Sequence, residues 1–289
     1  MNYIIKNDYL EVTISSLGAE IKSIKYLGEE RLHDSNPTYW NRSAPLLFPN
    51  IGITEAYFNQ IYYPLPKHGI VRNSEVRLIN QTISSITFSL DSSIETKKMY
   101  PFDFYIEISY ELINNEIKGT FKVKNPDYLP LPFNFGLHPA FKLPINDNEE
   151  FSDYLIDFHN PNNYQIPTLY ADSGFMDFTK ITREFENLKE LKLNYSDYDD
   201  DALVFTNLNT NQVTLKHQSI NKGVTVKFDG FTKLGIWTPA RKNAPFICIE
   251  PWIGCSDDVN KNHEFYEKED LIVLDKDEEK IIEYSYIFF

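Results

Sequence analysis

Two ionisable residues each follow an apolar segment and stand directly before a proline: His138 after Phe135-Gly136-Leu137, and Glu250 after Phe246-Ile247-Cys248-Ile249. A proline pushes the preceding residue toward extended backbone and cannot donate a ladder hydrogen bond, so each residue is expected where a strand ends. Apolar packing beside Glu250 would raise the pKa of its carboxyl group toward the range that suits a general base. The two residues together predict an acid/base pair, whereas separately they could be a solvated glutamate and a core histidine.

Further polar groups stand in similar surroundings. His68 and Arg72, in Lys67-His68-Gly69-Ile70-Val71-Arg72, offer a second imidazole and a fork of donors suited to adjacent hydroxyls or a carboxylate. Asp201 ends an acidic run just before Ala202-Leu203-Val204-Phe205, so it is expected to point inward at the start of a strand. Trp252 offers a flat aromatic face of the kind that suits the C–H face of a sugar ring.

Each of these residues also has a purely structural interpretation. Arg72 could pair with Glu75, the acidic run could be a solvated loop, and aromatic residues are more often used in core packing. The sequence contains no glycine-rich phosphate or dinucleotide loop, no G-x-S-x-G turn, and no His or Cys cluster at metal-ligand spacing. We therefore expect chemistry performed by side chains, with no cofactor and no metal.

Apolar and polar residues alternate with a period of two along most of the chain, which is typical of half-buried strands. Residues 104–112 and 117–123 flank Asn114-Asn115 and predict a hairpin, and residues 213–217 and 224–228 predict a second one. The other expected strands are residues 10–14, 86–90, 246–249 and 281–288. Helical spacing is scarce and is best at Glu184 to Leu191, with a turn expected at Pro37 to Trp40.

This pattern predicts an all-β protein, a large antiparallel β-sandwich in which two packed sheets cover each other's apolar faces. A chain of 289 residues with 42% hydrophobic residues can bury a large core, and neither a linker nor a repeat interrupts it. We expect one domain over residues 1–289.

The overall charge narrows the range of partners. A net charge of −14 argues against nucleic acid and against anionic membrane surfaces, because both need a basic footprint. The chain has no visible secretion signal and no apolar run long enough to span a bilayer, so we expect a cytoplasmic protein. In a reducing compartment its two cysteines, Cys248 and Cys255, are expected to be free thiols.

These motifs, in this order, resemble the aldose 1-epimerase (galactose mutarotase-like) family, and most closely its branch of LacX-like proteins and hexose-6-phosphate 1-epimerases. The resemblance covers nearly the whole chain. It is carried by Leu17-Gly18-Ala19-Glu20-Ile21, residues 40–52 with Pro45-Leu46-Leu47-Phe48-Pro49, residues 68–72, residues 136–141, Asp201-Ala202-Leu203 and residues 249–252.

The resemblance implies a galactose mutarotase-like supersandwich, in agreement with the strand pattern. It also implies that Glu250 is the general base and His138 the general acid, with His68, Arg72 and Asp201 holding substrate hydroxyls. Sugar-phosphate members carry an arginine before the Pro-x-x-Phe-Pro stretch, and Arg42 stands one residue too close to Pro45 to match them fully.

The expected reaction is interconversion of the α and β anomers of a hexose or hexose phosphate, by a monomer or homodimer whose partner is a small sugar. A non-catalytic sugar-binding sandwich is the alternative. It would not need an acid and a base facing each other across one sugar ring. A glycoside hydrolase normally needs two carboxylates flanking the scissile bond, which a Glu/His pair does not supply.

Overall fold

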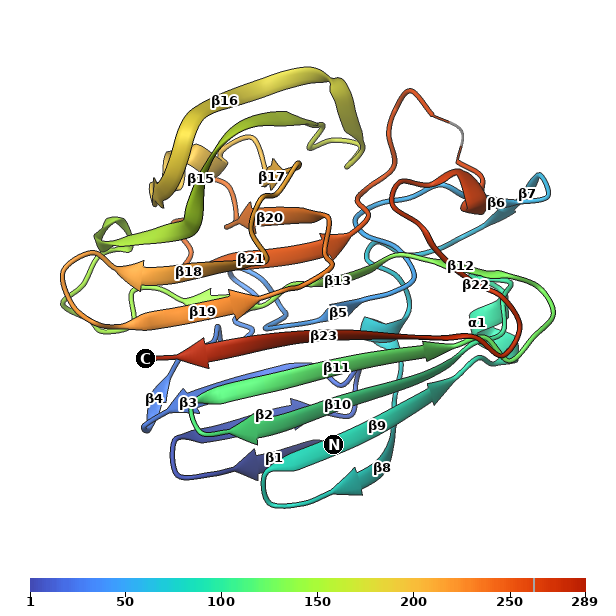
Figure 1. Cartoon of the computed structure of the whole chain (residues 1–289), viewed down its shortest axis with the longest axis horizontal. Helices are drawn as coiled ribbons and strands as arrows, with labels where there is room; N and C mark the ends of the chain where they lie inside the picture. The colour runs from blue at the N-terminus through green and yellow to red at the C-terminus, as the bar shows by residue number, and fades with distance from the viewer. Residues whose placement is uncertain (262) are drawn as a thin grey trace.

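The computed structural model describes residues 1–261 and 263–289, and the strands in them pair antiparallel (Figure 1). The largest sheet has nine strands in the order β16-β15-β18-β19-β23-β11-β10-β9-β8. In chain order these strands are β8 (Arg77–Gln81), β9 (Ser85–Asp91), β10 (Tyr105–Ile113), β11 (Glu116–Lys124), β15 (Tyr154–Leu169), β16 (Met176–Lys192), β18 (Gln212–His217), β19 (Gly223–Lys227) and β23 (Glu279–Phe288).

A six-stranded sheet has the order β17-β20-β21-β13-β5, with β14 also paired to β21, and a four-stranded sheet has the order β1-β2-β3-β4. Their strands are β1 (Asn2–Lys6), β2 (Leu10–Ser15), β3 (Ile21–Tyr26), β4 (Glu29–Glu30), β5 (Leu46–Leu47), β13 (Phe135–Leu137), β14 (Ala140–Lys142), β17 (Leu203–Phe205), β20 (Lys233–Trp237) and β21 (Phe246–Ile253).

Short elements complete the chain. Two small antiparallel pairs are the hairpin of β6 (Ala56–Phe58) with β7 (Ile61–Tyr63), and β12 (Leu131–Phe133) with β22 (Ile272–Leu274). The described helical segments are the single-turn α1 (Ile94–Lys97) and the 3-10 turns η1 (Val71–Asn73), η2 (Phe151–Asp153), η3 (Tyr195–Tyr198) and η4 (Phe265–Glu267). None of the described helices is long and apolar enough to cross a membrane.

The strands expected from alternation are confirmed, and each lies within or overlaps an observed strand. The hairpin of β10 and β11 runs from Tyr105 opposite Lys124 to Ile113 opposite Glu116 without a register shift, and β18 and β19 form the second hairpin. In β10 the burial alternates as the sequence does, because successive side chains of a strand point to opposite faces. The turn expected at Pro37 to Trp40 is also present, at residues 37–39.

The helix predicted from Glu184 to Leu191 is wrong, because these residues lie in strand β16. Phe185, Leu188 and Leu191 repeat every three residues, which imitates a helical spacing. The pairing of β15 with β16 is irregular in this stretch, and Asn187 has a positive φ of 50°. Bulges of this kind shift the strand's alternation by one residue, so the apolar side chains return to the same face at a spacing of three.

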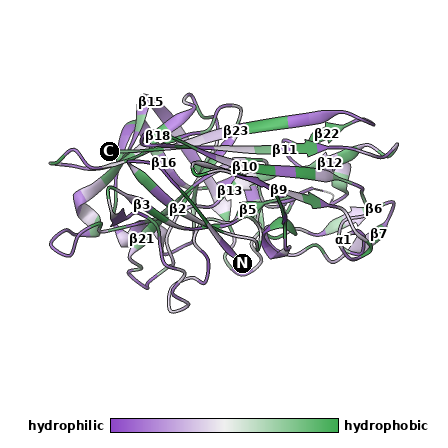
Figure 2. Ribbon diagram, turned by 90° about the horizontal axis from the view of Figure 1, so that it is seen from below, coloured by the Kyte–Doolittle hydropathy of each residue, from purple (hydrophilic) through white to green (hydrophobic). Residues whose placement is uncertain are grey.

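The main core lies between the nine-stranded sheet on one side and the six- and four-stranded sheets on the other. Phe121 of β11 stacks on Phe135 of β13 at 4.2 Å, and Tyr3 of β1 meets Phe88 of β9 edge-on at 5.5 Å. Each fully buried phenylalanine contributes about 1.5–3 kcal/mol of burial free energy. Figure 2 shows the hydrophobic colour gathered along the strands and the hydrophilic colour on the loops at the rim.

Strand β21 has two buried faces with different roles. Ile247 and Ile249 belong to the main core, whereas Cys248 and Trp252 pack in separate small clusters. The alternation of a strand therefore places Cys248, Glu250 and Trp252 together on the face turned away from the main core. Cys248 and Cys255 are free and buried, as expected.

Candidate active site

The pairing of β21 brings the two predicted catalytic residues together. Gly136 of β13 pairs with Trp252 of β21, and Ala140 of β14 pairs with Cys248 of β21, so both strands share one register against β21. His138 and Glu250 stand midway between these pairs, so they lie opposite each other and their side chains share one face of the sheet. Two residues 112 positions apart in sequence thus become cross-strand neighbours.

The expectation that both residues end a strand is confirmed for His138 and wrong for Glu250. His138 follows β13, and the chain re-enters the sheet as β14 after Pro139, whereas β21 continues through Glu250 and Pro251 to Ile253. The Ile249 N–H donates to the Pro139 carbonyl at 3.3 Å, so the next residue on that side of β21 is Pro251. Its missing N–H faces the break between β13 and β14, which is why this central strand tolerates a proline.

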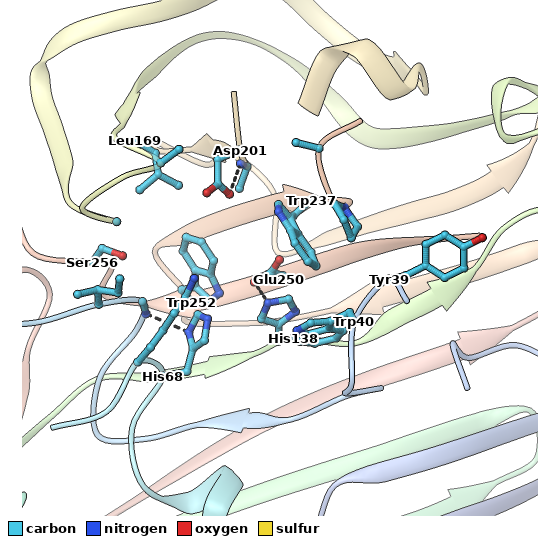
Figure 3. Close-up of a pocket in the computed structure, with 18 of the residues that line it drawn as sticks. Tyr39, Trp40, His68, His138, Leu169, Asp201, Trp237, Glu250, Trp252 and Ser256 are labelled. Carbon is cyan, nitrogen blue, oxygen red and sulfur yellow. Dashed lines mark hydrogen bonds and ion pairs between the residues drawn. The ribbon is translucent and has the colours of Figure 1, made fainter. Parts of the chain in front are cut away.

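His138 and Glu250 are in direct contact. His138 Nε2 lies 3.1 Å from Glu250 Oε2, and the two residues are 6% and 2% exposed (Figure 3). Burial raises the pKa of Glu250 well above its ordinary value, and the carboxylate of Asp201 raises it further. Burial also lowers the pKa of His138 well below its ordinary value, with Arg72 as the next cause. The site thus disfavours charge on both groups and shifts the two pKa values in opposite directions.

Aromatic rings fix the orientation of His138. Trp40 stacks on the imidazole with ring centroids 4.4 Å apart, and Trp237 meets it edge-on at 5.6 Å. The imidazole Nδ1 is buried and has no hydrogen-bond partner among the described residues, so Nε2 alone engages a neighbour. These contacts hold Nε2 toward Glu250 and the cavity.

His68 is held as a hydrogen-bond donor toward the cavity. The Gly52 N–H donates to His68 Nδ1 at 3.0 Å, so in the neutral ring the proton resides on Nε2. Burial, followed by His138, lowers the pKa of His68 and keeps the ring neutral. His68 has a positive φ of 64°, and a Cβ at Gly69 would come within 2.0 Å of the Phe48 carbonyl oxygen. The His-Gly dipeptide therefore serves a tight turn that aims the imidazole.

Arg72 and Arg42 have different places in the structure. Arg72 lines the cavity, and its guanidinium has no hydrogen bond or ion pair with any described residue, Glu75 included; burial lowers its pKa to about 10. Arg42 does not line the cavity. It donates to the Arg72 carbonyl at 2.9 Å, to Asn73 Oδ1 at 2.7 Å and to Glu20 Oε2 at 3.2 Å, so it braces the backbone that carries Arg72.

Asp201 and Trp252 both line the cavity. Asp201 has a positive φ of 90° and receives the Ala202 N–H on its own Oδ1. The indole of Trp252 fits because its neighbours are glycines: a Cβ at Gly136 or at Gly235 would lie 2.7 Å from ring atoms. The indole Nε1 is buried without a hydrogen-bond partner in the described part of the chain.

All these side chains except Arg42 surround one cavity of about 470 Å³. Figure 3 shows His138 and Glu250 in its middle, with His68 and Trp252 on one side and Trp40 and Tyr39 on the other. The end of β15 and the residues just before β17 lie above the pair and contribute Leu169 and Asp201. The cavity thus combines an acid/base pair, neutral and charged donors, and aromatic faces.

Two contributors were not singled out by the sequence argument. Trp40 was identified only as part of a longer motif, and its stacking on His138 is visible only in three dimensions. Cys248 was considered only for disulfide pairing, yet its Sγ lies within 4.8 Å of ligand atoms of His138 and Glu250. Its position two residues before Glu250 in a strand is the signal that places it on the same face.

Comparison with known proteins places most of the chain in one family. Residues 1–272 match the family described as aldose 1-epimerase. The chromosomal LacX protein of Lactococcus lactis subsp. lactis is 34% identical over 270 residues, which cover 90% of each chain. Its plasmid counterpart matches equally well.

Solved structures of related proteins have the same fold. A galactose mutarotase related enzyme from Lactobacillus acidophilus has a TM-score of 0.93 at 31% identity, covering 100% of this chain and 97% of its own. A galactose mutarotase-like protein from Lactobacillus casei has a TM-score of 0.91 at 25% identity, with full coverage of both chains. The fold is therefore galactose mutarotase-like, and the chain belongs to the aldose 1-epimerase family.

Proposed function

We propose that this protein interconverts the α and β anomers of a hexose or hexose phosphate by opening and reclosing the sugar ring. The observation that carries the proposal is the contact of His138 with Glu250 in the middle of a sugar-sized cavity. A binding protein needs aromatic faces and donors, but it does not need a buried acid and base in contact, each with a strongly shifted pKa. Buried groups with strongly shifted pKa values are typical of catalytic sites.

The reaction begins with Glu250 ionised and His138 protonated. Glu250 removes the proton from the C1 hydroxyl while His138 donates its proton to the ring oxygen, and the C1–O5 bond breaks to leave the open-chain aldehyde. Rotation about the C1–C2 bond presents the other face of the aldehyde, and the reverse proton transfers close the ring as the other anomer.

The pair holds one proton before and after ring opening: first on His138, then on Glu250. No proton needs to enter from solvent during the reaction. Because burial raises the pKa of Glu250 and lowers that of His138, the site favours the proton on Glu250 more than water does. This shift assists the ring-opening step, in which His138 gives up a proton and Glu250 takes one up.

The remaining cavity residues fit the task of holding the ring. His68 presents its Nε2–H, Arg72 presents a guanidinium with no partner in the described protein, and Asp201 presents an acceptor. Trp252 supplies an aromatic face next to Glu250. A ring fixed by these groups keeps C1 and the ring oxygen between base and acid, which lowers the entropic cost of reaction.

The test is anomer exchange measured by NMR, with polarimetry of freshly dissolved single anomers as an independent readout. Glucose, galactose and their 6-phosphates form the substrate panel. We expect faster exchange than in buffer alone with at least one of the four sugars. If none is accelerated although the protein binds one of them, the site is a sugar-binding site and the proposal is wrong.

A further inference from the structure

A third potential ligand lies next to the acid/base pair. Cys248 is on the same face of β21 as Glu250, and one ligand atom from each of His138, Cys248 and Glu250 lies within 4.8 Å of the other two. All three residues are buried, and His138 and Glu250 also line the cavity. One nitrogen, one sulfur and one oxygen thus converge at the cavity floor.

This combination is chemically selective. Thiolate, imidazole and carboxylate together are ligands that Zn²⁺ uses in proteins, whereas Mg²⁺ and Ca²⁺ take oxygen ligands. The three ligand atoms lie within 4.8 Å of one another. Zn²⁺ bonds are about 2.0–2.3 Å long, so two ligand atoms of a tetrahedral site lie about 3.3–3.8 Å apart. Small side-chain shifts would therefore close the site around an ion. The fourth coordination position would face the cavity.

The thiol is not committed to another role. Cys248 Sγ makes no hydrogen bond with any described residue, and its cluster neighbours are the apolar residues Ala140, Ala244 and Phe246. The ring-opening reaction does not use it. A buried thiol beside an acid/base pair, without a hydrogen-bond partner among the described residues, is a feature that the proposed sugar chemistry leaves unexplained.

We propose that His138, Cys248 and Glu250 form a Zn²⁺ site, and that Zn²⁺ bound there blocks the sugar reaction. On binding, the thiol proton and the single proton shared by His138 and Glu250 pass to solvent, and the three side chains become ligands. The imidazole lone pair and the carboxylate are then held by the metal, so neither can exchange a proton with a sugar. The binding of Zn²⁺ does not depend on the proposed function, whereas the inhibition of anomer exchange by Zn²⁺ rests on it.

Binding is tested with Co²⁺ as a spectroscopic substitute for Zn²⁺ on the metal-free full chain. We expect a cobalt–thiolate charge-transfer band in the near ultraviolet that Zn²⁺ abolishes and that excess Mg²⁺ leaves in place. The chain has two cysteines, so Cys255→Ala leaves Cys248 as its only thiol. The band should persist in that variant and disappear in Cys248→Ala. If the wild-type protein or Cys255→Ala gives no band, the site does not exist, even if Cys248→Ala fails to fold.

Inhibition is tested by adding Zn²⁺ during anomer exchange, with each variant compared to its own metal-free rate. The Zn²⁺ concentration giving half inhibition should rise at least about tenfold in Cys248→Ala and stay near the wild-type value in Cys255→Ala. Equal sensitivity of the two variants would overturn the inhibitory role. If no sugar is turned over at all, the function proposed above fails while the cobalt spectrum still decides the metal site.

Discussion

Two glutamates of this protein are equally buried and have opposite surroundings. Glu20 and Glu250 are each 2% exposed. The Glu20 carboxylate accepts the Ser43 N–H at 2.6 Å and is paired with Lys22 at 3.1 Å and Arg42 at 3.2 Å. Its charge is compensated by two cations and by backbone donors, which is how a buried carboxylate acts as a structural anchor.

Glu250 lacks such compensation. The Glu250 carboxylate contacts the imidazole of His138. Asp201 adds a second negative charge nearby, whereas the exposed Lys67 lowers the pKa of Glu250 by a smaller amount. The pKa of Glu250 is therefore raised well above its ordinary value by burial first and by Asp201 second. The comparison teaches that equal burial can leave one carboxylate compensated by cations and backbone donors and the other with few partners among the described residues.

The largest expected effect is that of Glu250→Gln. The change keeps the shape of the side chain and removes the base, so anomer exchange should fall by about 10³ or more. Exchange NMR measures the loss, and a circular dichroism spectrum like that of the wild type shows that the fold is kept. A variant that retains a tenth of the activity would contradict the assignment of Glu250 as the base.

The same variant should be more stable than the wild type at pH 7–8. Since the folded-state pKa of Glu250 is raised, the native state holds this proton more tightly than the unfolded chain, and stability falls as pH rises from the ordinary pKa near 4.5 toward the raised one. Glutamine does not titrate, so it removes this penalty. Denaturant unfolding should show the gain at pH 7–8 and its disappearance below about pH 4.

Glu20→Gln should have the opposite signature. Removing the negative charge leaves Arg42 and Lys22 without their buried partner, so the free energy of unfolding should fall by about 2–3 kcal/mol. Chemical denaturation at neutral pH measures the loss. The folded fraction should keep an exchange rate within about an order of magnitude of the wild type. If both glutamate variants change stability in the same direction, the contrast between the two sites is wrong.

The sequence was sufficient to predict the strands with clear alternation, and His138 and Glu250 as a candidate pair, because alternation and proline positions are local signals. It predicted Glu250 beside apolar packing, and the structure places it there. The contact with His138 depends on β13 and β14 sharing one register against β21, which no local pattern encodes. The helix predicted at Glu184 to Leu191 is wrong for the same reason: the spacing of the apolar residues there depends on a bulged pairing with β15, which no local pattern encodes.

Arg42 and Arg72 show the same contrast among cations: Arg42 is held by protein groups, whereas Arg72 lines the cavity. Arg72→Met should raise KM for the preferred sugar about tenfold to thirtyfold and change kcat less, because an unpartnered guanidinium is available to bind substrate. Steady-state exchange rates at several sugar concentrations separate the two constants. Arg42→Met is the matched control.

Arg42→Met should lower stability and raise KM by less than Arg72→Met, since Arg42 is held by Glu20, Asn73 and the Arg72 carbonyl. A larger KM effect at Arg42 would mean that it reaches the sugar directly. The sequence separated the two arginines only by the spacing of Arg42 to Pro45, which is one residue shorter than in the sugar-phosphate members of the family. Their difference depends on which guanidinium meets the carboxylate of Glu20.

The smallest expected effect concerns the indole N–H of Trp252. This group lies near the Glu250 carboxylate without a well-formed hydrogen bond and lowers the pKa that burial and Asp201 raise. In the wild type, kcat/KM should fall on the acid side as Glu250 becomes protonated, with a midpoint above its ordinary pKa near 4.5.

Trp252→Phe keeps an aromatic ring and removes the N–H, so the pKa of Glu250 should rise and the acid limb should move to higher pH by less than about one unit. Trp237→Phe is the control, because Trp237 touches His138 edge-on at 5.6 Å and has no part in the pKa shift of Glu250. Rate profiles from pH 4 to 8 decide the matter. A shift toward lower pH in Trp252→Phe, or an equal shift in both variants, would mean that ring packing sets the acidity of Glu250. A shift in Trp252→Phe alone would mean that the indole N–H lowers the pKa of Glu250 although it forms no well-defined hydrogen bond with the carboxylate.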